Sequence, residues 1–230
     1  MNKSIDIVDF HAHILPRADH GSSSVEVTLA QLKLAKESGV CRIVATPHFY
    51  PNSHTVDAFL KRREAAYNAL CDVASLDMPK IALGAEVLLC ENLHKLDGLS
   101  SLTLEGTNVL LLELPYQEIE DAHVQTVASL ISCGYRIILA HADKYAKADV
   151  EKMLVLGASI QLNANALTSW FTPRHILDWI ERGAVVCLGS DIHGKDKHAY
   201  TRFVKAKNKF KDKILYLKEK SDSLWKLSEK

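Results

Sequence analysis

Histidine is unusually frequent in this chain of 230 residues, which holds eleven of them. Many stand beside acidic residues in short polar motifs that directly follow an apolar run. Neutral imidazole nitrogens and carboxylate oxygens are ligands that suit Zn, Mn or Fe in proteins. The pattern therefore predicts a metal site, whose candidate ligands are His11, His13, His48, Glu86, Glu113, His141, Asp191 and His193.

The placement of these candidates carries more weight than their types. A single histidine or glutamate at a strand end is more often a surface residue than a ligand, because most polar side chains face water. Here the candidates follow six of seven predicted strands at the same end. In a parallel barrel these ends lie on one face, where such folds place their active sites. A cation would also supply the partner that buried charges require.

Seven apolar runs rich in Val, Ile or Leu are the predicted strands, and each is followed by a longer segment of helical period. This alternation is typical of parallel strands joined by helices, with both faces of the strands buried. We therefore expect an α/β barrel one unit short of the usual eight. The runs are Ile5–Val8, Cys41–Ala45, Ile81–Leu83, Val109–Leu112, Arg136–Ala140, Ala158–Leu162 and Ala184–Leu188.

Charge and composition exclude several other classes of protein. Lys and Arg number 28 and Asp and Glu also number 28, so the chain lacks the basic excess of a non-specific nucleic-acid binder. No window approaches the roughly 18 uninterrupted apolar residues that a membrane span needs. Five cysteines without a C-x-x-C pair argue against a disulfide framework. We expect a soluble, cytoplasmic protein.

The C-terminal segment differs in composition from the rest of the chain. Residues 195–230 hold twelve Lys and Arg against five Asp and Glu, and they also carry an apolar side. We expect residues 1–198 to form the metal-dependent barrel and residues 199–230 a basic helical extension, packed on the barrel or partly mobile. A role toward a membrane surface or an acidic partner is the alternative. The apolar residues are Phe203, Phe210, Ile214, Leu217, Leu224 and Leu227.

Other catalytic schemes find little support in the sequence. A cysteine phosphatase needs an Arg at the spacing from its thiolate that cradles phosphate, and none of the five cysteines has one. The chain also has no G-x-S-x-G elbow, no P-loop and no G-x-G-x-x-G motif. Water activated by a metal is the nucleophile that remains.

At the candidate metal ligands and the motifs around them, the chain resembles the PHP (polymerase and histidinol phosphatase) superfamily. Within it, the chain is similar to the bacterial protein-tyrosine phosphatases of capsule and exopolysaccharide loci. The resemblance runs from about Asp9 to His198. H-x-H alone is a weak marker, but its combination with the later motifs is specific. The motifs are D-F-H-A-H-I-L-P (Asp9–Pro16), D-H-G (Asp19–Gly21), A-T-P-H (Ala45–His48), G-A-E (Gly84–Glu86), L-E-L-P (Leu112–Pro115), L-A-H (Leu139–His141) and S-D-I-H (Ser190–His193).

The resemblance implies a distorted, TIM-like (β/α)7 barrel that holds three divalent metal ions, with Mn²⁺ in first place and Fe or Zn as alternatives. Glu86 would bridge two of them. Two or three cations within about 4 Å can clamp the attacking and leaving oxygens of a phosphoryl displacement and lower the pKa of a bridging water. By analogy the ligand sets are His11, His13, Glu86 and Asp191; Glu86, Glu113 and His141; and His20, His48 and His193.

Three positions depart from the pattern of the tyrosine phosphatases. His20 stands where they usually carry a second Asp, and Lys144 stands where they often have a phosphate-binding Arg. A further Arg after the last motif is missing, with His198 roughly in its place and Lys195 and Lys197 nearby. Lysine can meet phosphate as a point charge, but it lacks the bidentate fork of arginine. Lys144 and His198 are therefore the expected catalytic contacts to phosphate.

The expected activity is hydrolysis of phosphotyrosine by metal-activated hydroxide, on the Tyr-rich tail of a bacterial tyrosine kinase that controls capsule or exopolysaccharide biosynthesis. The alternative is a phosphatase of a small metabolite such as histidinol phosphate. An amide or lactone hydrolase is less favoured, because Glu113 stands where such barrels usually carry a bridging Lys. A non-catalytic binding module would show gaps among the ligands, and none is evident. We expect no nucleic-acid partner, and a homo-oligomer stays open.

Overall fold

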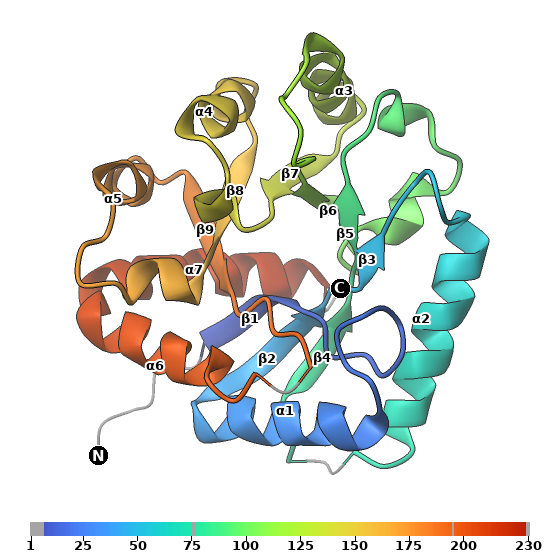
Figure 1. The fold of residues 1–230 in the computed structure, drawn as a ribbon, viewed down its shortest axis with the longest axis vertical. Coiled ribbons are helices and arrows are strands. Elements are labelled where there is room, and N and C mark those ends of the chain that lie inside the picture. The colour runs from blue at the N-terminus through green and yellow to red at the C-terminus, as the bar shows by residue number, and fades with distance from the viewer. Residues whose placement is uncertain (1–6, 75–76, 195, 229–230) are drawn as a thin grey trace.

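Helices connect most of the successive strands along the described chain, and every pairing between these strands is parallel (Figure 1). The computed structural model describes residues 7–74, 77–194 and 196–228. The strands are β1 (Ile7–Ala12), β2 (Val40–Ala45), β3 (His48–Phe49), β4 (Lys80–Leu83), β5 (Glu86–Leu88), β6 (Val109–Glu113), β7 (Arg136–Leu139), β8 (Ser159–Asn163) and β9 (Val185–Gly189). The helices are α1 (Val25–Glu37), α2 (Val56–Cys71), α3 (Asp121–Ser132), α4 (Lys147–Val155), α5 (Arg174–Glu181), α6 (Ala199–Lys209) and α7 (Lys211–Ser228). Short 3-10 turns are η1 (Leu93–Lys95), η2 (Leu99–Leu102), η3 (Ala142–Lys144) and η4 (Ala164–Leu167).

Each of the seven predicted strands corresponds to a strand of the structure. The first is described from Ile7 and continues to Ala12, so His11 lies within β1 and not after it. Residues 5 and 6 of its predicted range lie outside the described residues. The second and third predicted strands are each followed by a short additional strand, β3 and β5. Glu86 consequently begins β5, although the sequence placed it at the end of a strand.

These two additional strands arise from breaks at Pro47 and at Gly84. Pro47 has no N–H to donate to a neighbouring strand, so β2 ends before it. Pairing continues across the breaks, because the N–H of Gly84 donates to the Ala45 carbonyl at 2.9 Å. The N–H of Glu86 likewise donates to the Pro47 carbonyl at 3.1 Å. β2 and β4 therefore end side by side in one sheet, and their continuations, β3 and β5, pair with each other in the other sheet.

The strands form two parallel sheets, in the orders β1-β2-β4 and β3-β5-β6-β7-β8-β9. Beyond the end of β9 the chain returns to β1, where the N–H of Asp191 donates to the His11 carbonyl at 2.8 Å. The N–H of His13 donates in turn to the Ile192 carbonyl at 3.2 Å. The predicted α/β class with parallel strands is confirmed. A single closed barrel is not confirmed, because the breaks divide the described strands between two sheets.

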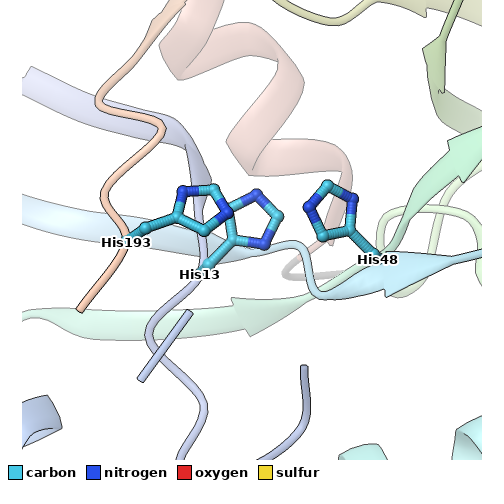
Figure 2. Close-up of side chains that lie close together, drawn as sticks. All are labelled: His13, His48 and His193. Atoms are coloured by element: carbon cyan, nitrogen blue, oxygen red, sulfur yellow. The ribbon is translucent and has the colours of Figure 1, made fainter. Parts of the chain in front are cut away.

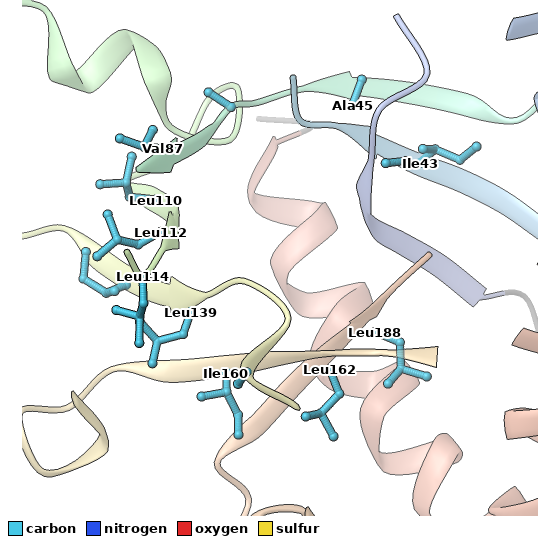
Figure 3. Packing of buried hydrophobic residues seen from close by; sticks show 14 of the residues in the cluster. Ile43, Ala45, Val87, Leu110, Leu112, Leu114, Leu139, Ile160, Leu162 and Leu188 are labelled. Atoms are coloured by element: carbon cyan, nitrogen blue, oxygen red, sulfur yellow. The ribbon is translucent and has the colours of Figure 1, made fainter. Parts of the chain in front are cut away.

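Successive side chains of the strands are buried on opposite faces. On β6, Leu110 and Leu112 pack with the apolar faces of the helices, in the core that Figure 3 shows in part, whereas Leu111 joins a separate inner cluster. Burial on both faces explains why these strands are continuous apolar runs in the sequence. The inner cluster draws residues from both sheets, from α7 and from the segments before β6 and after β7: Val8, Phe10, Val44, Ala82, Leu104, Val109, Leu111, Ile138, Ala140, Cys187, Leu224 and Trp225.

The C-terminal helices pack on the rest of the fold through apolar side chains. Phe203 of α6 and Leu217 and Leu224 of α7 are buried, and α7 contacts β1 and β9. Phe210 is partly buried, whereas the side chains of residues 214 and 227 lie outside those described. Within the described ranges, no helix is both long enough and apolar enough to cross a membrane.

Candidate metal centre

Two histidines at the end of the first strand, His11 within β1 and His13 just after it, begin the cluster. His11 and His13 lie two positions apart, so their side chains leave the backbone on the same side. Both are fully buried, and their Nε2 atoms lie 3.0 Å apart. Two ring nitrogens that face each other at this distance need a shared proton or a common cation between them.

Glu86 lies at the centre of the cluster and is fully buried. Its Oε2 lies 3.2 Å from Nε2 of His11 and 3.2 Å from Nε2 of His13. The same oxygen lies 3.0 Å from Nδ1 of His48, and Oε1 lies 2.7 Å from Nε2 of His141. Burial by itself raises the pKa of Glu86, but the histidines, led by His11, hold that pKa well below its usual range. Glu86 is therefore a carboxylate that faces imidazoles from several segments.

A second carboxyl group, that of Glu113 at the end of β6, faces the same histidines at longer range. Its Oε2 lies 3.7 Å from Nδ1 of His48, and its Oε1 lies 3.8 Å from Nε2 of His141. Burial and the negative charge of Glu86 raise the pKa of Glu113 to about 7. A cation between the two carboxyl groups would relieve their repulsion and allow both to ionise.

Histidine rings stack on one another within the cluster, and Figure 2 shows three of them, His13, His48 and His193, converging from separate segments. The ring centroids of His13 and His193 lie 4.0 Å apart. His20, which is exposed, lies 4.7 Å from His48 and 4.8 Å from His193 between ring centroids. Burial and the charge of His13 lower the pKa of His193 to about 4. A lowered pKa favours the neutral form of the imidazole, which is the form that binds a metal ion.

Asp191 follows β9 with a left-handed backbone, at φ +52°. This conformation is strained for a residue other than glycine, and such strain is frequent at functional sites. Its Oδ1 lies 3.7 Å from Nε2 of His11 and 3.6 Å from Nε2 of His13. Its Oδ2 accepts hydrogen bonds from Nζ of Lys144 at 2.5 Å and from Nδ2 of Asn163 at 3.0 Å.

Two residues outside the predicted ligand set hold these rings in place. The Nδ1 of His13 donates to the carboxylate of Asp19 at 2.6 Å. Oε1 of Gln161 lies 3.1 Å from Nδ1 of His11 and accepts the backbone N–H of His141 at 2.6 Å. Partners of this kind set the tautomer and the orientation of metal-binding histidines.

The sequence carries a signal for these orienting residues. β8 is the one predicted strand that supplies no candidate ligand, yet it contains the polar alternation Q-L-N. Gln161 and Asn163 lie on one face of the strand because side chains repeat every two residues, and both are buried. Two amides at that spacing in an apolar strand indicate a polar site on that face. The signal for Asp19 is its place in the D-H-G motif beside His20.

The donor set fits divalent metal ions. Oε2 of Glu86 and Nδ1 of His48 are buried 3.0 Å apart, and neither makes a hydrogen bond within the described part of the chain. Buried polar atoms without partners are costly unless an ion or a water satisfies them. Mixed imidazole and carboxylate ligands suit Mn, Fe and Zn. Three groups have ligand atoms within 4.8 Å of one another: His13, His48 and His193; His11, His13 and Asp191; and His48, Glu86 and Glu113.

The structure brings the nine predicted ligands together, and Lys144 borders them through Asp191. His198 stands apart. It is exposed at the start of α6, where its backbone N–H donates to Asp196 at 2.9 Å. Among the described residues, the ring contacts and ion pairs that join the cluster do not include His198. Of the two lysines expected nearby, Lys197 is exposed and Lys195 lies outside the described residues.

Comparison with known proteins adds sequence relatives to this geometry. The chain is 30% identical over 202 residues to CapC of Staphylococcus aureus, a candidate tyrosine-protein phosphatase. The alignment covers 81% of this chain and 77% of CapC. It is 25% identical over 224 residues to the tyrosine-protein phosphatase YwqE of Bacillus subtilis (strain 168). This alignment covers 93% of this chain and 84% of YwqE.

A solved structure and a family model agree with these relatives. The fold is similar to a chain from the crystal structures of YwqE from Bacillus subtilis and CpsB from Streptococcus pneumoniae, described as metal-dependent tyrosine phosphatases. The TM-score is 0.75 at 20% identity, over 95% of this chain and 93% of that one. The model of the capsular polysaccharide synthesis family CpsB/CapC matches residues 7–219. This chain therefore belongs to the CpsB/CapC family of capsular polysaccharide synthesis proteins.

Proposed function

We propose that this protein is a metal-dependent phosphatase that hydrolyses phosphotyrosine in a protein substrate. The observation that carries the proposal is the cluster around Glu86, where a buried carboxylate faces imidazoles from separate strands at 2.7 to 3.2 Å. Relatives named as tyrosine-protein phosphatases support the choice of substrate. The proposed substrate is the Tyr-rich tail of a bacterial tyrosine kinase in capsule biosynthesis, with the cytoplasm as the place of action.

The proposal assigns three divalent ions to the cluster, with Mn²⁺ in first place and Fe or Zn as alternatives. When bound, such ions lower the pKa of a water molecule and offset the negative charge of phosphoryl oxygens. Glu86 is proposed as a ligand in two of the three ligand sets, because its two carboxylate oxygens face different histidines. The sets are His11, His13, Glu86 and Asp191; Glu86, Glu113 and His141; and His20, His48 and His193.

Residues of the chain itself bind and orient the phosphate group. The ammonium group of Lys144 lies beside Asp191, and 41% of its side chain is exposed, so a phosphate group can reach it. Fixed positive charge near the phosphoryl oxygens stabilises the charge that they carry in the transition state. The phenolate of tyrosine leaves readily, so a strong proton donor is not required. His198, at the start of α6, is assigned an outer contact with the phosphate.

We also propose that residues 1–198 are the catalytic unit and residues 199–230 its helical extension, which packs on that unit through apolar side chains of α6 and α7. We further propose that the two sheets are parts of one distorted (β/α)7 barrel. Two observations support this: the inner cluster takes side chains from both sheets, and β1 contacts the segment after β9.

A panel of substrates tests the proposed function. The purified protein is supplied with Mn²⁺ and assayed on a phosphotyrosine peptide, histidinol phosphate and a carboxylic ester. We expect the peptide to give the highest kcat/KM and a chelator to abolish its hydrolysis. A strong preference for histidinol phosphate would replace this function with that of a small-molecule phosphatase. Turnover of the ester alone would contradict a phosphatase of either kind.

A further inference from the structure

Tyrosines lie beside the metal centre on separate loops. Tyr50 follows β3, Tyr116 follows β6 and Tyr145 follows the turn after β7. These strands belong to one run of the larger sheet, in the order β3-β5-β6-β7. Because parallel strands end at the same edge, the three loops approach the cluster from the same side.

Two of these rings are held against proposed metal ligands. The ring of Tyr50 stacks on His48, with 5.2 Å between centroids and 18° between planes. The ring of Tyr145 lies 5.4 Å from that of His141. The hydroxyl of Tyr145 also accepts the backbone N–H of Leu114 at 3.1 Å, which ties the loop after β6 to the loop after β7. The loop that carries the third tyrosine is thus fixed close to the site.

Tyr116 stands at the end of this fixed segment and is 87% exposed. Leu114, two residues before Tyr116, is bound by the hydroxyl of Tyr145, whose ring lies against His141, so Tyr116 leaves the fold beside the metal centre. A ring this exposed adds little to the packing of the core. Exposed large aromatic side chains beside a site are typical of binding surfaces, because a rigid ring offers contact area at low entropic cost.

We propose that Tyr116 and Tyr50 form an aryl subsite that receives the ring of a phosphotyrosine side chain while its phosphate group lies at the metal centre. This inference rests on the proposed function and adds the residues that distinguish an aryl phosphate from an alkyl phosphate. Aromatic rings attract one another when their centroids are about 4.5–7 Å apart in an offset or edge-on arrangement. An alkyl phosphate such as phosphoserine has no ring to make that contact.

Binding of two phosphonates that cannot be hydrolysed tests the subsite without any turnover. Calorimetry on the Mn²⁺-loaded protein measures the affinities for phenylphosphonate and methylphosphonate, and their ratio reports the contribution of the ring. We expect the wild type to prefer phenylphosphonate and Tyr116→Ala to lower the ratio about tenfold. Tyr116→Phe keeps the ring and should retain the ratio.

Trp170→Ala is the matched control, because Trp170 is 89% exposed and lies in a segment tied to the C-terminal end of α6. There Lys209 donates to the Ser169 carbonyl and to Oγ1 of Thr172. We expect this variant to keep the wild-type ratio.

The outcomes separate the subsite from the proposed function. Equal affinities in the wild type, or an unchanged ratio in Tyr116→Ala, would overturn the subsite even if phosphotyrosine is hydrolysed. A ratio that depends on Tyr116 in a protein unable to hydrolyse phosphotyrosine peptides would support the subsite and overturn the proposed function.

Discussion

Single residues of the cluster have pKa values that their neighbours displace in opposite directions. The histidines, above all His11, outweigh burial and hold the pKa of Glu86 well below its usual range. Burial and the charge of Glu86 raise the pKa of Glu113 to about 7. Divergent pKa values among groups in contact are typical of functional sites. Because ligands bind cations in their deprotonated forms, metal binding should release protons from this cluster.

Glu86→Gln is expected to deplete bound metal and to lower kcat about 100-fold or more, because a neutral amide replaces the carboxylate shared by two ligand sets. Elemental analysis after dialysis gives the metal content, and the phosphotyrosine peptide assay gives kcat. Glu64→Gln is the matched control, since Glu64 is exposed on α2. Full metal content together with full activity in Glu86→Gln would reject the central role of this carboxylate.

The pairing of Asp19 with His13 predicts a dependence of stability on pH in the metal-free protein. Burial raises the pKa of Asp19, but its hydrogen bond with His13 and the charge of that ring outweigh burial and bring the pKa below its usual range. A carboxyl group with a lowered folded-state pKa stabilises the fold above its unfolded pKa, near 3.8. That stabilisation is lost as the pH falls through the folded-state pKa.

Asp19→Asn should therefore lower the free energy of unfolding by about 1–3 kcal/mol at pH 5. The difference from the wild type should shrink as the pH is lowered toward the acid limit of folding. Urea titrations of both metal-free proteins at a series of acidic pH values measure it. A difference that stays constant over the whole series would show that the charge of Asp19 does not contribute.

At the scale of elements, the close approach of β9 to β1 and β8 decides where the ligands stand. A Cβ atom added at Gly189, the last residue of β9, would lie 2.6 Å from Cβ of His11 and 2.6 Å from Nε2 of Gln161. Real Cβ atoms do not come this close to other heavy atoms, so glycine is required there. The position of the His11 ring thus depends on the packing of three strands.

Gly189→Ala is expected to destabilise the fold by about 1–3 kcal/mol through overpacking and to weaken metal binding, because His11 or Gln161 must move. Gly84→Ala, at the break between β4 and β5, is the control, since the nearest atom to its added Cβ lies at 3.4 Å. Urea titration and metal titration measure the two effects. A normal metal affinity in a stably folded Gly189→Ala protein would contradict this account of His11.

The sequence predicts the order of strands better than it predicts the shape of the sheets. Apolar runs of local periodicity locate strands buried on both faces, and motifs at their ends converge because parallel strands end on one side. The division of the strands into two sheets at Pro47 was not predicted, because a local motif does not show which strand its segment will pair with. The Q-L-N pattern predicts a polar face on β8, but the partners of Gln161, which are His11 and the backbone of His141, depend on contacts across the fold that the pattern does not show.

At the scale of the whole molecule, α7 helps to complete the core. Leu224 and Trp225 are buried in the inner cluster among residues of both sheets. Arg42 of β2 lies over the ring of Trp225, 5.7 Å from its centroid, and forms an ion pair with Asp222 of the same helix. The helix is basic in composition, but its apolar face is part of the interior. The stability of the sheets should therefore depend on the end of the chain.

Trp225→Ala tests this dependence. Removing a large aromatic side chain that is 3% exposed leaves a cavity in the inner cluster, and the expected loss is about 3–5 kcal/mol in the free energy of unfolding. Trp170→Ala removes the same side chain from a position that is 89% exposed, and it should change that free energy by less than about 0.5 kcal/mol. Urea titration of the two variants beside the wild type measures both. If Trp225→Ala were as stable as Trp170→Ala, α7 would contribute nothing to the core and would be a separable appendage.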